Sequence, residues 1–407
     1  MRQNMRNFFQ KLAAPVVAGV ISLAALTGTT FAEQWEKTVV LANGQKVYWN
    51  AWGGSETYNN YISWVVDRVE EDYGIELIHV KLTDTADAVR RVLAEKSAGR
   101  DENGSIDLIW INGENFRQMK ENGLLFGPFV ENLPNFKLID TDEKPSTILD
   151  FTLPTDGYES PWGMAQLIFI HDHARVPNPP KSISAFMEYA KANPGRVTYP
   201  ALPDFTGTTF MKQVLYEVSD NPSRLLVDAG DEFDQETEKL WAWLDEIRPY
   251  LWREGKQFPK NGDEMIQLLD DGEIDFAYSF NVGSASNAIQ EGKLPETARS
   301  FVMENGTIGN THFVAIPYNS AHKQAAQVVA NFLMSPEAQA RKQDPEYWGE
   351  ITVLSMSQLK DEDKARFNTI PRHEATLSND ELGKSLSEPH SSWMTMIEAK
   401  WLSKFGS

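Results

Sequence analysis

Aromatic, amide and carboxylate side chains gather with glycine in five short segments, at residues 49–54, 110–115, 160–166, 203–209 and 278–283. Tryptophan rings offer flat faces to apolar and cationic groups, and amides and carboxylates supply hydrogen bonds. Glycine lets the backbone approach a bound molecule closely. The combination suits the capture of a small molecule, although a buried tryptophan or a threonine-rich helix cap has the same composition when it serves only packing.

Two of these segments supply candidates for one side of a binding site. Trp52 offers a stacking surface, and Asn112, Glu114 and Asn115 offer polar contacts. Each of these residues follows a run that favours a β-strand. We expect them to contact a ligand together.

The candidates for the other side surround the start of a predicted helix at residues 205–216. The free N–H groups of a helix N-terminus favour a carboxylate, a phosphate or a carbonyl oxygen. We expect ligand contacts from this helix start and from the segment 278–283, namely from Phe205, Thr206, Gly207, Thr208, Tyr278 and Asn281.

Several kinds of chemistry lack the residues that they need. The chain has no cysteine, which excludes thiolate nucleophiles, disulfides, cysteine-ligated zinc and iron–sulfur clusters. The patterns Gly-x-Ser-x-Gly and His-Glu-x-x-His are absent too. His171 and His173 share a face of a predicted strand, but without a third ligand nearby we expect an exposed strand edge. We therefore expect no catalytic residue, metal or cofactor.

The N-terminus indicates where the protein acts. Three basic residues within the first eleven positions precede an uncharged run that ends in Thr-Phe-Ala at residues 30–32. This order is typical of a secretory signal peptide. We expect cleavage near Ala32 and a mature protein in the periplasm.

The charge of the chain restricts its partners. The formal net charge is −20, and it becomes about −23 when the three basic signal residues are removed. Nucleic acids and anionic lipids call for basic surfaces, so we expect neither as a partner. The acidity is compatible with a cationic ligand, although it also serves solubility alone.

Strand-like and helix-like runs alternate from residue 46. Residues 46–49, 75–81 and 106–111 favour strands, and residues 59–73 and 84–99 carry apolar side chains at helical spacing. A second alternating series begins at residue 166. Such alternation predicts an α/β fold, in which ligand-binding loops lie beyond the carboxyl ends of the strands.

Four strings carry a resemblance to a known family: WNAWGG, LIWINGENF, PDFTGTTF and AAQVVANFLMSPEAQ. Together with the signal peptide they resemble extracellular solute-binding proteins of ABC importers, and more narrowly the YnjB-type branch. The last string is common in the wider family, whereas the other three are more specific to the branch. The resemblance spans nearly all of the mature chain.

This resemblance implies a two-lobed periplasmic-binding-protein fold of type II, with hinge crossovers and a ligand cleft between the lobes. It implies capture of a small solute and its delivery to an ABC permease in the inner membrane, and we expect a monomer. Trp162 lies at the first crossover, as a wall of the cleft or as hinge packing. The boundaries that we expect are residues 1–32 for the signal peptide, 33–165 with 312–407 for lobe one, and 166–311 for lobe two, with crossings near 162–169 and 311–317.

The sequence leaves the ligand open. Trp52 with Glu114 suits a cation with a flat or methylated group, such as a thiamine-like or amine compound, whereas the helix start near Gly207 suits an anionic end. A zwitterion fits both, and a sulfate-like anion stays possible. Ferric iron is not expected because no adjacent tyrosine pair occurs. A periplasmic enzyme on the same fold would show turnover, and a scaffold or chaperone would show no saturable small ligand.

Overall fold

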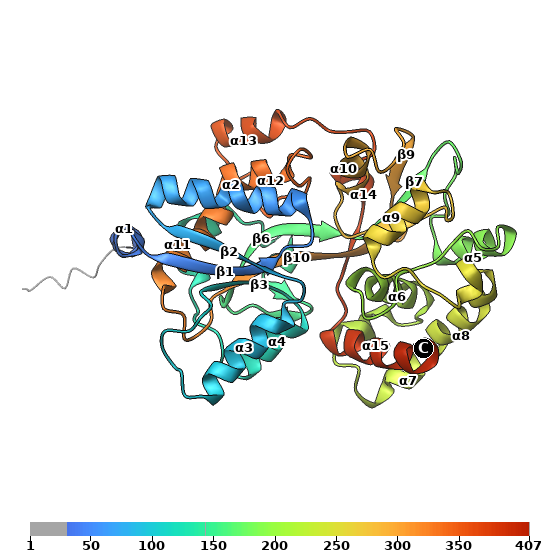
Figure 1. Cartoon of the computed structure of the whole chain (residues 1–407), viewed down its shortest axis with the longest axis horizontal. Coiled ribbons are helices and arrows are strands. Elements are labelled where there is room, and N and C mark those ends of the chain that lie inside the picture. Colours follow the sequence, from blue (N-terminus) through green and yellow to red (C-terminus); the bar gives the residue numbers. More distant parts are fainter. Residues whose placement is uncertain (1–30, 143, 407) are drawn as a thin grey trace, which may run out of the picture.

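The structure is a computed structural model that describes residues 31–142 and 144–406. The expected signal peptide lies outside the described residues up to residue 30, and its last two residues begin helix α1 (Phe31–Ala42). Within the described part of the chain, no helix is long and apolar enough to span a membrane. The elements form two lobes that lie side by side (Figure 1).

A six-stranded mixed sheet forms the centre of the first lobe. The parallel strands β2, β1 and β3 are neighbours in that order, and β10 follows antiparallel to β3. β10 also pairs with β6 along most of its length and with β11 at its start. The strands are β1 (Lys46–Trp52), β2 (Glu76–Leu82), β3 (Leu108–Ile111), β6 (Glu159–Gln166), β10 (Thr307–Ala315) and β11 (Ser385–Ser387).

Helices pack on this sheet through apolar stripes. α2 lies above the sheet and α3 and α4 below it in Figure 1. α2 buries Ile62, Val65 and Val69 at helical spacing and ends at Gly74, whose φ of 65° suits glycine. The helices of this lobe are α2 (Glu56–Tyr73), α3 (Ala86–Ser97), α4 (Glu114–Glu121), α11 (Lys323–Leu333), α12 (Pro336–Gln343) and α13 (Asp361–Asn368), beside the hairpin of β4 (Leu149–Asp150) and β5 (Leu153–Pro154).

The second lobe contains a small antiparallel sheet in the order β8, β7, β9. Its strands are β7 (Ile168–Asp172), β8 (Ala277–Ser279) and β9 (Ala298–Phe301), and its helices are α5 (Ile183–Ala192), α6 (Phe205–Val218), α7 (Phe233–Glu236), α8 (Glu238–Ile247), α9 (Gly262–Asp270), α10 (Ser284–Gln290), α14 (Asn379–Leu382) and α15 (Ser391–Phe405). The expected α/β architecture with two lobes is confirmed.

Three segments carry the chain between the lobes. β6 continues into β7 through Leu167, and β9 leads back into β10. A third crossing follows α13, because α14 and α15 lie with the second lobe (Figure 1). The first crossing falls within the range expected near residues 162–169, whereas the second lies before β10 rather than near 311–317, and the third was not expected.

The C-terminal helix therefore corrects the expected boundaries. We expected residues 312–407 in lobe one, but Trp393, Ile397 and Trp401 of α15 are buried in one hydrophobic cluster with residues of the second lobe. Nε1 of Trp401 donates to the hydroxyl of Tyr199 over 3.2 Å. Three apolar positions on one helix face predict burial, but they do not say against which lobe.

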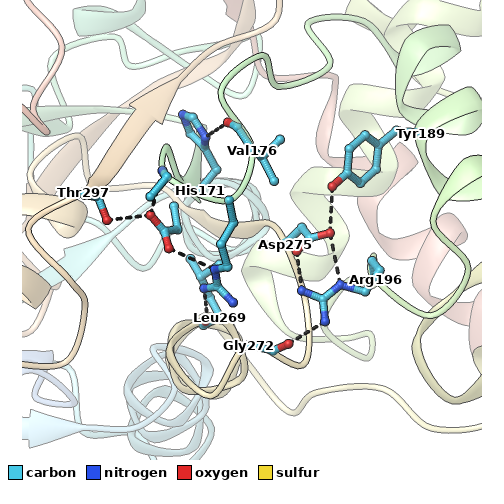
Figure 2. A network of polar contacts seen from close by, with 11 residues as sticks. His171, Val176, Tyr189, Arg196, Leu269, Gly272, Asp275 and Thr297 are labelled. Atoms are coloured by element: carbon cyan, nitrogen blue, oxygen red, sulfur yellow. Dashed lines mark hydrogen bonds and ion pairs between the residues drawn. The ribbon is translucent and has the colours of Figure 1, made fainter.

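At the far end of the second lobe, polar contacts tie β7 to its neighbours (Figure 2). Asp172 accepts from Nε of Arg175 and from the hydroxyl of Thr297. His171 is buried, and its Nδ1 donates to the carbonyl of Val176 over 2.9 Å. We expected an exposed strand edge for both histidines, but β7 is the central strand of its sheet, so only His173 is exposed. Among the described residues, no group of three side chains has the geometry to hold a metal ion.

The buried His171 predicts a loss of stability in acid. Burial lowers the pKa of His171 to about 4. The nearby His173 and Arg299 also lower this pKa, whereas Asp172 raises it. Between about pH 6.5 and pH 4 the unfolded chain thus binds a proton that the folded chain does not, so this contribution is complete above pH 6.5 and is lost as pH falls. His171→Asn keeps a donor for the carbonyl of Val176. We expect the free energy of unfolding of this variant to fall by about 1–2 kcal/mol less than that of the parent between pH 7.5 and pH 5. Urea unfolding at pH 7.5 and pH 5 measures it, and equal pH dependence in both proteins would contradict the assignment.

Candidate ligand-binding site

Aromatic side chains line the edge of the first lobe's sheet where β1 and β3 end. Trp52 ends β1, Trp110 lies in β3, and Tyr58 comes from the first turn of α2. The Tyr58 ring lies 5.4 Å from that of Trp52, and the Trp110 ring lies 5.0 Å from that of His312. These four side chains are half-buried, and Trp348 is fully buried against Tyr58 with ring centroids 3.9 Å apart. We call these five residues the aromatic wall.

A buried lysine supports the wall from behind. Nζ of Lys342 lies 3.5 Å from the ring centroid of Trp162 and 4.2 Å from that of Trp348, and it forms an ion pair with Glu350. Glu350 also lies 2.8 Å from Nδ1 of His312. Burial lowers the pKa of Lys342 to about 8. Burial opposes the charge on Glu350, but His312 and Lys342 hold its pKa below the usual value.

The second lobe presents the N-terminus of α6, and one of its own side chains occupies it. Oδ1 of Asp204 accepts from the backbone N–H of Thr206 over 3.0 Å and from that of Gly207 over 3.1 Å. These are the groups that we expected to receive a ligand oxygen. Burial raises the pKa of Asp204, and the nearby charge of Asp263 in α9 adds to the rise. The starts of α6 and α9 adjoin, since a Cβ on Gly262 would lie 3.5 Å from the hydroxyl oxygen of Thr206. We call Asp204 and Asp263, at these two helix starts, the acidic pair.

The charge of one member of the acidic pair acts on the aromatic wall from the second lobe. Burial raises the pKa of Tyr58, the charge of Glu350 adds to this rise, and Asp263 of the second lobe adds more. A hydrogen bond between the Tyr58 hydroxyl and Asn281 opposes the shift. One residue of the wall is therefore influenced by two groups of the opposite lobe.

Several predicted site residues lie at this contact. Oε2 of Glu114 accepts from the hydroxyl of Thr395 in α15 over 3.1 Å. The Asn281 amide donates to the carbonyl of Trp348 over 3.2 Å. Phe205 is 37% exposed and lies edge-on to Phe280. Three further candidates, at the starts of α4 and α6, are half-buried: Asn112, Asn115 and Thr206.

Four other candidates serve packing. Trp162 is fully buried in the core of the first lobe, so of its two expected roles it has hinge packing. Tyr278 donates its hydroxyl to the carbonyl of Thr198 and is buried in the second lobe's core. Thr208 is buried and donates to Glu398 over 2.8 Å. Gly207 lies so close to Pro200 that a Cβ would meet its carbonyl oxygen. We remove these four from the proposed site.

Beside the acidic pair, a second buried lysine lies between the lobes. Lys212 of α6 is fully buried, and its Nζ forms an ion pair with Glu388 over 2.6 Å. The same Nζ lies 5.0 Å from the ring of Phe151 in the first lobe and 5.3 Å from the ring of Phe205. Phe151 sits in the turn between β4 and β5 with a φ of 45°, which is uncommon for a bulky residue. The turn holds this ring against the opposite lobe.

Sequence reasoning missed much of this arrangement. Trp110 stands inside a segment that we singled out, at the end of a predicted strand, so its position carried a usable signal. Tyr58 follows the Gly-Gly loop by a few residues. His312, Trp348 and Asp263 reach the contact only through the tertiary fold, and nothing in their local sequence indicates it.

Two adjoining cavities of about 410 and 250 Å³ lie beside the crossings. They share Gln343, Ile351, Phe367 and Leu382, and the smaller also touches Val282 of the second lobe. The site residues predicted from sequence, all of which the structure describes, do not line them. These two cavities are thus distinct from the aromatic wall.

Comparison with known proteins identifies the class. Residues 64–368 match the family described as "Bacterial extracellular solute-binding protein", and the chain belongs to this family. Members of this family serve as the substrate-binding components of ABC importers. Over 390 residues the chain is 44% identical to "Protein YnjB" of Escherichia coli K12, covering 95% of this chain and 97% of the relative. The predicted family and function are therefore confirmed.

Solved structures show the same fold at low sequence identity. A putative extracellular solute-binding protein from Bordetella parapertussis superposes with a TM-score of 0.64 at 13% identity, covering 89% of this chain and 99% of the other. A putative spermidine/putrescine ABC transporter protein from Listeria monocytogenes gives 0.61 at 17%, covering 88% and 98%. Iron-bound HitA from Pseudomonas aeruginosa gives 0.62 at 14%, covering 89% and 99%.

The buried pair between the lobes predicts a large cost when one partner is removed. Glu388→Gln leaves the ammonium of Lys212 without its nearest counter-charge in a buried position, so we expect a loss of about 3–5 kcal/mol in the free energy of unfolding. Glu76→Gln breaks the exposed Lys46–Glu76 pair and is the matched control, with an expected cost below about 1 kcal/mol. Denaturant unfolding of both variants measures the difference. Similar small losses would show that Lys212 finds another partner.

Proposed function

We propose that this protein captures a small cationic solute with a flat or methylated group in the periplasm and delivers it to an ABC permease. The observation that carries the proposal is the group of three half-buried rings in the aromatic wall, those of Trp52, Tyr58 and Trp110, together with the acidic pair of Asp204 and Asp263. A cation gains from aromatic faces and from carboxylates together.

The occupied helix N-terminus argues in the same direction. An anionic ligand at α6 would have to displace Asp204 from two backbone N–H groups and would meet its charge and that of Asp263. The two buried lysines near the lobe contact are each already paired with a glutamate. The formal charge of −20 agrees with a cation.

Capture proceeds without chemistry in this proposal. A solute that touches both lobes does so only when they are closed, so binding shifts the population toward the closed form. Burial of about 250 Å² of apolar ligand surface, at about 25 cal/mol per Å², contributes roughly 6 kcal/mol. With cation–π contacts of about 1 kcal/mol each, and after the costs of ordering, micromolar affinity results. We infer that the protein acts as a monomer and has no enzymatic turnover.

The relatives support several ligand classes. The Listeria monocytogenes protein carries a spermidine/putrescine name, and another similar structure, from Actinobacillus pleuropneumoniae, has fructose-6-phosphate bound. At 13–17% identity such names do not select a ligand. The choice of a cation rests on the side chains described above.

Mass spectrometry of the protein from its own periplasm, native and then denatured, tests the proposal directly. We expect a stoichiometric organic cation to be released on denaturation. The same spectrum measures the expected cleavage near Ala32. A released anion, or chemical conversion of the bound molecule, would contradict the proposal, and an empty protein would be titrated with amines, thiamine-like compounds and oxyanions.

Two variants test the residues. We expect Asp263→Asn to weaken binding of the identified cation roughly tenfold, which is about 1.4 kcal/mol, because a carboxylate charge is lost. Trp52→Ala removes one face of the wall, and we expect a similar loss. Asp270→Asn, at the exposed far end of the same helix α9, is the matched control and keeps parental affinity. Calorimetric titration measures all three, and equal affinities throughout would place the ligand elsewhere.

A further inference from the structure

The loop of residues 344–350, which follows α12, contacts both lobes. Its Trp348 ring stacks on Tyr58 of the first lobe, with ring centroids 3.9 Å apart and an interplanar angle of 11°. The carbonyl group of the same Trp348 accepts hydrogen bonds from the side-chain amides of Asn281 and Asn287 in the second lobe, each over 3.2 Å. One residue thus joins the aromatic wall to the opposite lobe.

Two glycines make this contact possible. A Cβ on Gly283 would lie 3.1 Å from Cα of Gly349 and 3.0 Å from the carbonyl oxygen of Trp348, and a Cβ on Gly349 would lie 3.1 Å from Cα of Gly283. Gly283 has a φ of −85°, which any residue adopts. Glycine is needed at position 283 because the two backbones touch, rather than for its backbone conformation.

The loop is fixed to the first lobe. The backbone N–H groups of Gly349 and Glu350 donate to the carbonyl of Lys342 over 3.0 and 3.1 Å. The Glu350 carboxylate pairs with the Lys342 ammonium, which lies over the Trp348 ring. The loop therefore belongs to the first lobe, and its contacts with Asn281, Asn287 and Gly283 cross the junction between the lobes.

We propose that Trp348 and Gly349 form a closure lock, in which the two asparagine amides and the Gly283 backbone of the second lobe dock on this loop and hold the lobes closed before solute binds. For its link to the solute the proposal rests on the proposed function, because Tyr58 belongs to the wall on which the cation stacks. Trp348 is a positioning residue: it orients Tyr58 and stabilises the closed lobes, and it contacts no solute itself.

The absence of cysteine lets two labels report closure. Ser63 on α2 and Gln267 on α9 are exposed, lie on different lobes, and become unique labelling sites when each is replaced by cysteine. Spin-label distances in the solute-free protein then give the ratio of closed to open molecules. No ligand is added, so a wrong assignment of the cation does not affect this readout.

We expect the parent to show a closed population and Gly283→Ala to lower the closed-to-open ratio at least tenfold, because the new methyl group separates the backbones. Asn287→Ala removes one amide without adding bulk, and we expect a threefold or larger decrease. Gln290→Ala removes an exposed amide from the same helix α10 and keeps the parental ratio. Thermal unfolding confirms that each variant folds.

Two outcomes would overturn the lock. If Gly283→Ala and Asn287→Ala close as fully as the parent, the contact does not hold the lobes. If the parent itself shows only the open distance without solute, the lock is too weak to act alone. If no cation binds in the titrations but the spin-label distances change as expected, the proposed cationic ligand is rejected and the closure lock is retained.

Discussion

The pairing of β6 with β10 is the constraint on which the rest of the structure depends. The two strands pair from Gly309 with Gln166 to Ala315 with Glu159, and β3 pairs with the other edge of β10. Both strands also join the lobes: β6 runs on into β7, and β9 leads into β10. A paired ladder resists stretching and shear but bends at its ends, so the lobes can rotate about it while each keeps its own sheet intact. The positions of Trp110 in β3 and His312 in β10 are fixed by the same ladder.

Local patterns predicted the parts of the fold that local physics decides. Alternating strand and helix runs predicted the α/β class, and the spacing of Ile62, Val65 and Val69 predicted the end of α2 before Gly74 and placed its start three residues late. Local patterns could not predict which lobe α15 packs against. Trp393, Ile397 and Trp401 specify a buried helix face, but either lobe offers an apolar surface, and only the third crossing brings the helix to the second. Long-range pairing of this kind depends on the whole chain.

The candidate site shows the same division. Composition singled out loops at strand ends, because glycine, tryptophan and amides have few purely structural uses in combination, and part of these loops lies at the contact between the lobes. It did not tell a ligand-facing ring from a packed one, and Trp52 and Trp162 look alike in sequence while one is half-buried and the other fully buried. The buried pairs Lys212–Glu388 and Lys342–Glu350 were equally hidden, since their partners lie 176 and 8 residues apart and charged side chains are ordinarily expected at the surface.

In the proposed function, the cap of α6 bears on the sign of the ligand's charge more directly than the wall does. Aromatic faces bind neutral rings as well as cations, so a wall alone gives little charge discrimination. At α6 the chain's own Asp204 takes the N–H groups that an anion would use, and Asp263 stands nearby. Under the proposed function, an anion at this helix start would meet charges of its own sign, whereas an ammonium would meet charges of the opposite sign. A helix terminus that would ordinarily attract anions is thus capped by the chain's own carboxylate, and under the proposed function the aromatic wall selects the shape of the cation.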